Sequence, residues 1–299
     1  STRAERGTAA DVVKQQPGES QFYSGLPKDM DPKTAIDRRR LWSFLHATQQ
    51  EELNKYVGTQ MEKEVEKCID QDIRTFGIIH VMKNGISVQN LKLDLFYKRP
   101  SEADGDTAKW KYAANQFSVT RQQTYSLLNP GNEIDMVIFV NGLPLMTFEL
   151  KNPWTWQTAL KDGQKQYKEN RSPKDTSFNF GRCRAHFAVD KDEAYFTTRV
   201  NGKNTFFMPF NKGLPDGQGK GNPVNPNGHK TAYLWEQVLR RDTVADILMN
   251  YTQFDYGEKK TMKMVPHIMK NAKKLIFPRF HQLDVVNKLI DDVETCGEG

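Results

Sequence analysis

The chain has few cysteines and no long apolar run, and these two shortages exclude several classes of protein. Cys68, Cys183 and Cys296 are its only cysteines, and they lie far apart. Without a Cys-x-x-Cys pair or a nearby pair of histidines, the sequence predicts neither a disulfide framework nor a structural zinc site. No stretch approaches the roughly 18 apolar residues of a membrane span, and the first residues contain no signal-peptide core. We therefore expect a soluble, cytoplasmic protein without a membrane partner.

A phosphate-binding loop is also missing. No Gly-x-x-x-x-Gly-Lys-Ser/Thr occurs, and the glycine-rich segment 217–221 lacks both the spacing and the hydroxyl that cradle phosphates and Mg²⁺. The chain is therefore not expected to be a nucleotide-driven enzyme in its own right.

Basic residues are in excess, because 43 Lys and Arg against 37 Asp and Glu give a net charge of +6. This charge fits a polyanionic partner without requiring one.

Hydrophobic periodicity in the first hundred residues predicts two helices and a hairpin. Residues 1–32 are polar and broken by prolines, so an irregular lead-in is expected there. Helical spacing of apolar residues predicts one helix over 33–45 and a second over 61–69. The segment 76–99 then alternates more like strands around an Asn84-Gly85 turn, which predicts a β-hairpin.

The centre of the chain predicts a buried sheet. A short strand is expected over 116–119, and the most apolar stretch, 134–150, is broken only at Asn141-Gly142. Residues apolar on both faces indicate central strands. A helix over 156–168 and further strands over 187–210 follow, so the order is mixed α/β. The segment 213–229 holds five glycines and three prolines, which predicts a domain edge before two helices at 233–239 and 244–251.

Two carboxylates interrupt the apolar stretch. An uncompensated charge at such a buried position costs several kcal/mol, so Asp135 and Glu149 require partner groups or a metal ion. Lys151 shares the face of Glu149, because side chains alternate along a strand. A two-residue loop at Asn141-Gly142 would pair Asp135 with Phe148 and send Glu149 to the opposite face. Asp135 therefore joins the pair only if the hairpin has an odd loop or a bulge.

With that geometry the site would suit phosphodiester hydrolysis. The two carboxylates, helped by the backbone carbonyl of Leu150, would offer the hard oxygen ligands that Mg²⁺ prefers. The cation would polarise a phosphate and lower the pKa of its water, while Lys151 would orient that nucleophile. A structural alternative stays open, in which Glu149 and Lys151 form a strand-end ion pair and Asp135 accepts from local backbone amides.

The helix predicted after the hairpin adds a basic surface. Gln164 and Tyr167 lie three residues apart, so both are expected to face one groove and contact DNA. From Lys161 to Arg184 seven basic residues stand against three acidic ones, an excess suited to phosphates. The expected phosphate contacts are Lys165, Lys168, Arg171 and Lys174.

The segment 132–153, which contains the acidic hairpin, resembles the R subunit of type I restriction enzymes. The likeness extends to 46–50, 77–85, 115–117 and 277–282 in the family's order, and so covers most of the chain. It implies a restriction-endonuclease-like α/β fold, of the PD-(D/E)xK kind, with a mixed central sheet flanked by helices. In such a fold Asp135, Glu149 and Lys151 would carry Mg²⁺-dependent cleavage of DNA, with the two carboxylates as metal ligands.

The chain departs from the family pattern at two places. Ile134 replaces the proline or charged residue that precedes the aspartate. The Gln-x-x-x-Tyr motif is shifted, with Gly163 four residues before Tyr167 and the glutamine at 164. Related nucleases also use a glutamate on an N-terminal helix, and only Glu5 lies early enough for that role.

The resemblance also implies a larger assembly. An ATP-driven motor follows the nuclease domain in this family, and Arg279 and Gln282 lie in a segment like the one that reads adenine. We expect a nuclease domain over 1–228, a helical linker over 229–275 and the truncated start of the motor over 276–299. ATP would serve only the full-length subunit, and the partners would be double-stranded DNA and the modification and specificity subunits. The alternative function is a non-catalytic module that docks DNA or that complex.

Overall fold

A computed structural model describes residues 22–101, 103–151, 157–215, 217, 219–255 and 272–296. Most of the predicted lead-in, with Glu5, and the predicted helix start at 156 lie outside this range. The prediction of a mixed α/β fold is confirmed, because one seven-stranded sheet with both parallel and antiparallel neighbours is accompanied by helices.

The sheet has the strand order β1-β6-β7-β8-β9-β10-β11. Its strands are β1 (Tyr23–Ser24), β6 (Phe117–Thr124), β7 (Glu133–Val140), β8 (Leu143–Leu150), β9 (Ala185–Val189), β10 (Ala194–Thr197) and β11 (Met208–Pro209). The pairs β1–β6 and β8–β9 are parallel, and the others are antiparallel. The longest strands, β6, β7 and β8, include the stretch that is apolar on both faces, as expected of central strands.

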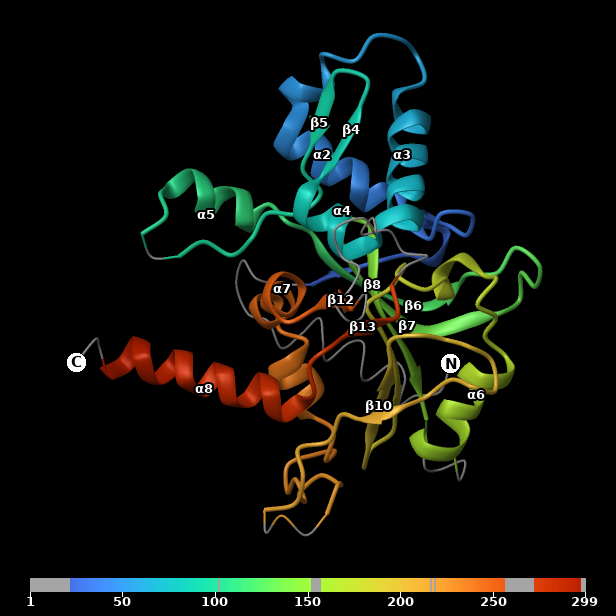
Figure 1. Ribbon diagram of the computed structural model, residues 1–299, viewed down its shortest axis with the longest axis vertical. Helices are drawn as coiled ribbons and strands as arrows, with labels where there is room; N and C mark the ends of the chain where they lie inside the picture. Colours follow the sequence, from blue (N-terminus) through green and yellow to red (C-terminus); the bar gives the residue numbers. More distant parts are fainter. Residues whose placement is uncertain are drawn as a thin grey trace, which may run out of the picture.

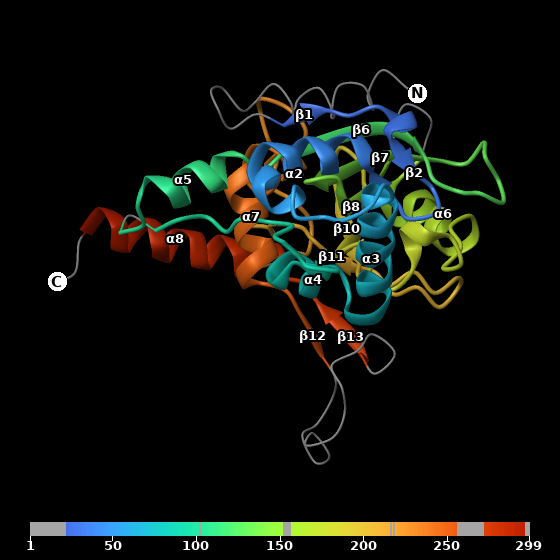
Figure 2. The same ribbon diagram turned by 90° about the horizontal axis from the view of Figure 1, so that it is seen from above.

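Helices lie on both sides of this sheet (Figures 1 and 2). The longer ones are α2 (Arg38–Leu53), α3 (Met61–Phe76), α4 (Ile78–Asn84), α5 (Asp106–Ala113), α6 (Gln164–Glu169), α7 (Arg241–Asn250) and α8 (Phe280–Cys296). Short helical turns are η1 (Pro27–Asp29), η3 (Ala159–Gly163), η4 (Thr176–Phe178) and η5 (Leu234–Val238). Small two-stranded sheets pair β2 (Met30–Asp31) with β3 (Ile36–Asp37), β4 (Ile86–Val88) with β5 (Leu91–Leu93), and β12 (Gln253–Asp255) with β13 (Lys274–Ile276). In both views α6 lies on the side of the molecule opposite α5 and α8.

Two predictions about the N-terminal third are wrong. The first helix begins at Arg38 and not at Lys33, because Asp37 caps it by accepting the Arg40 N–H at 3.0 Å. The segment 78–84 is the helix α4 and not a strand, and the hairpin is confined to β4 and β5. Gly85 has a positive φ of 68°, which ends this helix where a hairpin turn was expected.

The β7–β8 hairpin has a two-residue turn followed by a bulge. Asn141 and Gly142 have φ values of 50° and 78°, as a type I′ turn requires, and Val140 pairs with Leu143. The register then shifts, because Phe139 pairs with Pro144 but Ile138 pairs with Met146. Leu145 is the extra residue, and from there to the open end Met136 lies opposite Phe148. The next residues along, Asp135 and Glu149, therefore face each other across the two strands, so the required bulge is present.

The two faces of the hairpin belong to different cores. Met136, Ile138 and Val140 point into a large apolar core shared with α2, α3 and α4. Val137 and Phe139 point the other way, into a smaller core that also contains Tyr167 of α6 and other aromatic side chains. Asp135 and Glu149 belong to this second face, because side chains alternate along each strand.

The C-terminal part shares the larger core. Leu234, Val244 and Leu248 are buried in it together with Phe277 and Phe280, close to aromatic rings of the sheet. Beyond Leu283 the helix α8 carries exposed apolar residues, with Val285 54% and Leu289 59% exposed. The domain limits at 228 and 275 stay predictions. Within the part of the chain described above, no helix has the length and apolar character needed to cross a bilayer.

The hairpin turn gives a test of this fold. A Cβ on Gly142 would lie 2.4 Å from the Asp37 carbonyl oxygen and 2.6 Å from the Leu41 nitrogen, in addition to the strain of its positive φ. We predict that Gly142→Ala lowers the free energy of unfolding by about 2 kcal/mol or more, measured by urea denaturation. Gly131→Ala is the control, because no atom lies within 4 Å of its added Cβ, and it should change stability by less than about 0.5 kcal/mol. Equal losses would contradict the described turn.

Candidate active site at the acidic hairpin

Asp135, Glu149 and Lys151 lie together at the open end of the β7–β8 hairpin. The Lys151 Nζ lies 3.9 Å from Asp135 Oδ2 and 3.9 Å from Glu149 Oε2. Asp135 Oδ2 also accepts the backbone N–H of Leu150 at 2.7 Å, which ties the two strands at the cluster. The structure therefore brings together the three residues that the sequence singled out, on the face that the bulge selects.

Glu149 is fully buried, and its two carboxylate oxygens have different surroundings. Oε1 accepts two hydrogen bonds from the Arg171 guanidinium, from Nε at 2.9 Å and from Nη2 at 2.7 Å. No group among the described residues donates a hydrogen bond to Oε2, although Lys151 Nζ lies 3.9 Å away. Burial raises the pKa of Glu149 to about 8, and the nearby Asp135 adds to the rise, whereas Arg171 and Lys151 oppose it.

Arg171 is the main site residue whose role the sequence analysis missed. It was expected to contact DNA phosphates, but only 5% of the residue is exposed and its guanidinium is bound to Glu149. Its Nη2 also donates to the Glu133 carbonyl at 2.7 Å and its Nη1 to the Tyr125 hydroxyl at 3.1 Å. In the sequence, this role of Arg171 was indicated only by the expected burial of Glu149, because a buried carboxylate needs a cationic partner.

The helix α6 holds the second partner of Lys151. Gln166, which the sequence analysis did not consider, accepts a short hydrogen bond from Lys151 Nζ through its Oε1. Gly163 precedes this helix, and a Cβ there would lie 2.8 Å from the Cβ of Ala188 in β9 and 3.6 Å from Cγ of Lys151. The missing side chain at 163 therefore lets the helix approach the sheet closely enough for Gln166 to reach the cluster.

The other predicted DNA contacts divide into buried and exposed residues. Tyr167 is fully buried, its hydroxyl lies 2.9 Å from Thr147 Oγ1 and donates to the Phe187 carbonyl at 3.2 Å, and Gln164 is 9% exposed. Burial leaves Tyr167 inside the second core rather than at a groove. Lys165 and Lys174 are exposed, and Lys168 is half-buried on the same helix as Lys165.

A histidine lies behind the cluster without joining it. His186 Nδ1 is 2.8 Å from Thr147 Oγ1, and Thr147 in turn contacts Tyr167. Complete burial lowers the pKa of His186 to about 3, so the imidazole is neutral at physiological pH. His186 is therefore a structural group on this face and no proton donor for a substrate.

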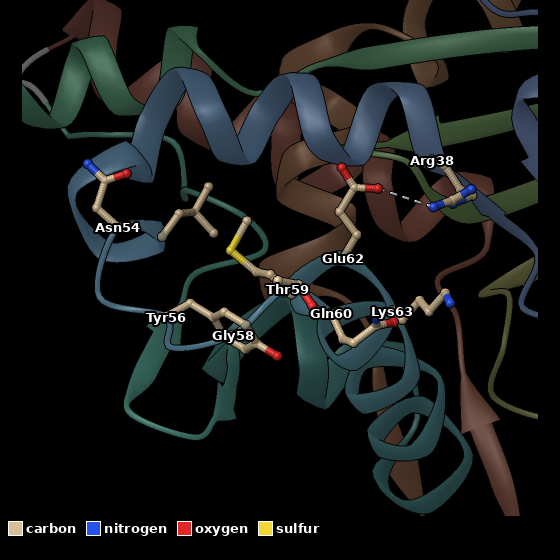
Figure 3. Close-up of a pocket in the computed structure, with 10 residues that line it drawn as sticks. Arg38, Asn54, Tyr56, Gly58, Thr59, Gln60, Glu62 and Lys63 are labelled. Carbon is tan, nitrogen blue, oxygen red and sulfur yellow. Dashed lines mark hydrogen bonds and ion pairs between the residues drawn. The ribbon is translucent and has the colours of Figure 1, made fainter.

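Other parts of the fold offer less chemistry. Across the described residues no trio of His, Cys, Asp and Glu side chains is grouped so that it could hold a metal ion. A pocket between α2 and α3 lies away from the acidic hairpin (Figure 3), and Arg38 on its wall is bound to Glu62 at 3.4 Å and to Glu66 at 2.7 Å. Its lining residues are Arg38, Leu53, Asn54, Tyr56, Gly58, Thr59, Gln60, Met61, Glu62 and Lys63.

The segment that was compared with an adenine-reading motif begins α8. Gln282 caps this helix, since its Oε1 accepts the backbone N–H of Arg279 at 2.8 Å. Both side chains are exposed. Nucleotide binding by Arg279 and Gln282 stays a prediction.

Comparison with models of known protein families identifies a match. The family model for the type I restriction enzyme R protein N terminus matches residues 23–205, more than half of the chain, and spans the hairpin, Gln166 and Arg171. A search of curated proteins returned no match.

The raised pKa of Glu149 predicts a pH dependence of stability. A carboxyl that binds its proton more tightly in the folded protein stabilises the fold most below its ordinary pKa of 4.5, and this contribution is lost as the pH rises through about 8. Glu149→Gln keeps the acceptor for Arg171 and cannot ionise. The quantity to follow is the free energy of unfolding of the wild type minus that of Glu149→Gln. It should fall as the pH rises from about 4.5 to about 8, by up to about 1.4 kcal/mol per pH unit. Urea denaturation without divalent cations measures it, and parallel pH curves would contradict the raised pKa.

Proposed function

The chain belongs to the family of type I restriction enzyme R protein N termini, and from this membership we propose that it is the Mg²⁺-dependent endonuclease domain of such a subunit. The proposed fold is the PD-(D/E)xK nuclease fold, and the proposed reaction is hydrolysis of a DNA phosphodiester bond. Asp135, Glu149 and Lys151 would carry it.

One observation supports this proposal above the others: a fully buried carboxylate oxygen, Glu149 Oε2, faces Lys151 and accepts no hydrogen bond from any residue that the structure describes. A buried acceptor without a donor costs about 1–3 kcal/mol, and a bound cation would offset that cost. The facing Asp135 doubles the negative charge at the same point. The two carboxylates, whose charges Lys151 and Arg171 offset, present oxygen atoms of the kind that a divalent cation prefers.

The residues present fit Mg²⁺. The donors are hard oxygens, namely Glu149 Oε2, the Asp135 carboxylate and, in our proposal, the carbonyl of Leu150 between Glu149 and Lys151. Since only two carboxylates are present, the remaining positions would be left to water and to phosphate oxygens. When bound, Mg²⁺ supplies Lewis-acid stabilisation of negative charge on a phosphate and lowers the pKa of a water molecule.

Lys151 has the clearest role among the chain's own groups. Its side chain is 10% exposed, its ammonium lies 3.9 Å from both carboxylates, and Gln166 of α6 accepts a hydrogen bond from it. A cation held so firmly can donate a hydrogen bond to the attacking water or to a phosphate oxygen without first being reordered. Hydrolysis then adds water across one phosphorus–oxygen bond, and Lys151 offsets the extra negative charge that develops.

Lysines near α6 would guide the DNA backbone to this site. Lys165 is 66% exposed and lies 3.9 Å from Glu169, a weak surface pair, and Lys174 follows in the next loop. We propose that Lys165, Lys168 and Lys174 contact phosphates without reading sequence. Membership of the family implies a restriction complex and DNA, so we also propose the modification and specificity subunits as partners, with ATP used by the motor region of the full-length subunit.

Substitutions in the cluster test the proposal. Asp135→Asn should abolish DNA nicking and weaken Mg²⁺ binding, because it removes a ligand charge. Lys151→Gln should keep Mg²⁺ affinity within a few-fold, because lysine is no ligand, yet slow nicking by roughly a hundredfold or more. The measurements are calorimetric titration of the chain with Mg²⁺ and nicking of supercoiled DNA by the assembled complex.

Glu62→Gln, on the exposed surface of α3, is the control and should behave as the wild type. Glu149→Ala is a poor test, since it would leave Arg171 buried without its partner at a cost of about 3 kcal/mol or more. If Asp135→Asn and Lys151→Gln nick DNA at the wild-type rate, the acidic hairpin is structural and the docking function is favoured.

A second prediction concerns the lysines. Changing both Lys165 and Lys174 to Gln should weaken DNA binding for all sequences alike and flatten its dependence on salt by about one unit of log-log slope per lost contact. Fluorescence anisotropy at several salt concentrations measures this slope. The matched control is Lys67→Gln with Lys109→Gln, since both are exposed and lie on α3 and α5. Equal effects of the two pairs would mean that DNA does not approach along α6.

A further inference from the structure

Arg171 is held rigidly at the back of the acidic cluster. Its side chain is 4% exposed, and its guanidinium reaches Glu149, the Glu133 carbonyl and the Tyr125 hydroxyl at 2.7–3.1 Å. It also lies 5.2 Å from the centre of the Tyr125 ring. Because all three guanidinium nitrogens donate hydrogen bonds, Arg171 cannot turn without breaking several contacts at once.

This arrangement makes the two oxygens of Glu149 unequal. Oε1 accepts two N–H groups of a cation, at 2.9 and 2.7 Å, which occupies the directions in which it could accept. Oε2 is left facing Lys151 and the Asp135 side of the cluster. If the carboxylate rotated by half a turn, the two oxygens would exchange places. Arg171 would then bind the other oxygen, and one oxygen would still be left for a metal ion.

We propose that Arg171 is a positioning residue that limits Glu149 to one metal-binding oxygen, and that the site therefore takes a single divalent cation. This inference rests on the proposed nuclease function and deepens it. A pair of catalytic metal ions lies about 3.5–4 Å apart and shares bridging ligands. Glu149 cannot bridge two ions through its two oxygens, because Oε1 is bound to Arg171.

Charge supports the same conclusion. A second dication beside Oε1 would lie next to the buried guanidinium, where repulsion between like charges is strong because little water screens it. Asp135 offers no easy alternative as a bridge, since its Oδ2 already accepts the Leu150 N–H at 2.7 Å and lies 3.9 Å from the Lys151 ammonium. Two cationic side chains, Lys151 and Arg171, therefore already lie beside the two carboxylates, which disfavours a second metal ion.

The test is titration of the chain with Mn²⁺, followed by calorimetry and by electron paramagnetic resonance. The wild type should bind one Mn²⁺ per chain at the cluster, with no spin coupling between ions, and Asp135→Asn should remove that site. Arg171→Lys keeps the positive charge but cannot hold Oε1 from two nitrogens, so it should weaken Mn²⁺ binding by about tenfold. Arg38→Lys is the control and should bind Mn²⁺ as the wild type, because it makes the same exchange at an ion pair of α2 away from the cluster.

The outcomes separate this inference from the function on which it rests. Two coupled Mn²⁺ ions in a wild type that nicks DNA would overturn the single-ion site and leave the nuclease proposal intact. No Mn²⁺ and no nicking would overturn both. If Arg171→Lys binds Mn²⁺ as tightly as the wild type, Arg171 does not position Glu149, and urea denaturation shows whether that variant is folded. If Arg171→Lys does not fold, the number of Mn²⁺ ions bound by the wild type still tests the single-ion site.

Discussion

The register of the β7–β8 hairpin is the constraint on which the candidate site depends. The type I′ turn at Asn141-Gly142 by itself would pair Asp135 with Phe148, and Glu149 would then point to the opposite face from Asp135. The extra residue Leu145 shifts the pairing by one and brings both carboxylates to the face of α6. Leu145 and its neighbour Met146 are both buried in the larger core, so apolar packing stabilises the bulge that arranges the charges.

The buried charges then determine the local architecture. Glu149 is removed from water, and without a cation it would be strongly destabilising. Arg171 and Lys151 approach it from two directions, one from the loop after α6 and the other from the end of β8 itself. The same contacts fit a structural role and a catalytic one. The two roles differ in how they account for Glu149 Oε2. In a purely structural role this buried oxygen would accept no hydrogen bond from the described residues, whereas in the catalytic role it would bind the metal ion.

The approach of α6 to the sheet links the cluster to the surface. Gly163 allows this helix to pack against Ala188, and one helical turn carries Tyr167 into the core and Gln166 to Lys151. The exposed lysine at 165 then lies on the outside of the same short helix. The helix α6 thus buries Tyr167, contacts Lys151 through Gln166 and presents Lys165 to solvent.

The sequence alone determined the mixed α/β class, the central strands and the pairing of Glu149 with Lys151, because these depend on local periodicity. It did not determine the helix α4, since a short apolar run fits a strand or a buried helix equally well. It left open whether Asp135 joins the cluster, because one bulged residue reverses the face of a strand and has no local signature. Arg171 was assigned to the surface by its basic neighbours, yet it lies buried against a carboxylate 22 residues away. Only the tertiary structure decided that partnership, because a buried charge is paired by whichever opposite charge the fold brings within reach.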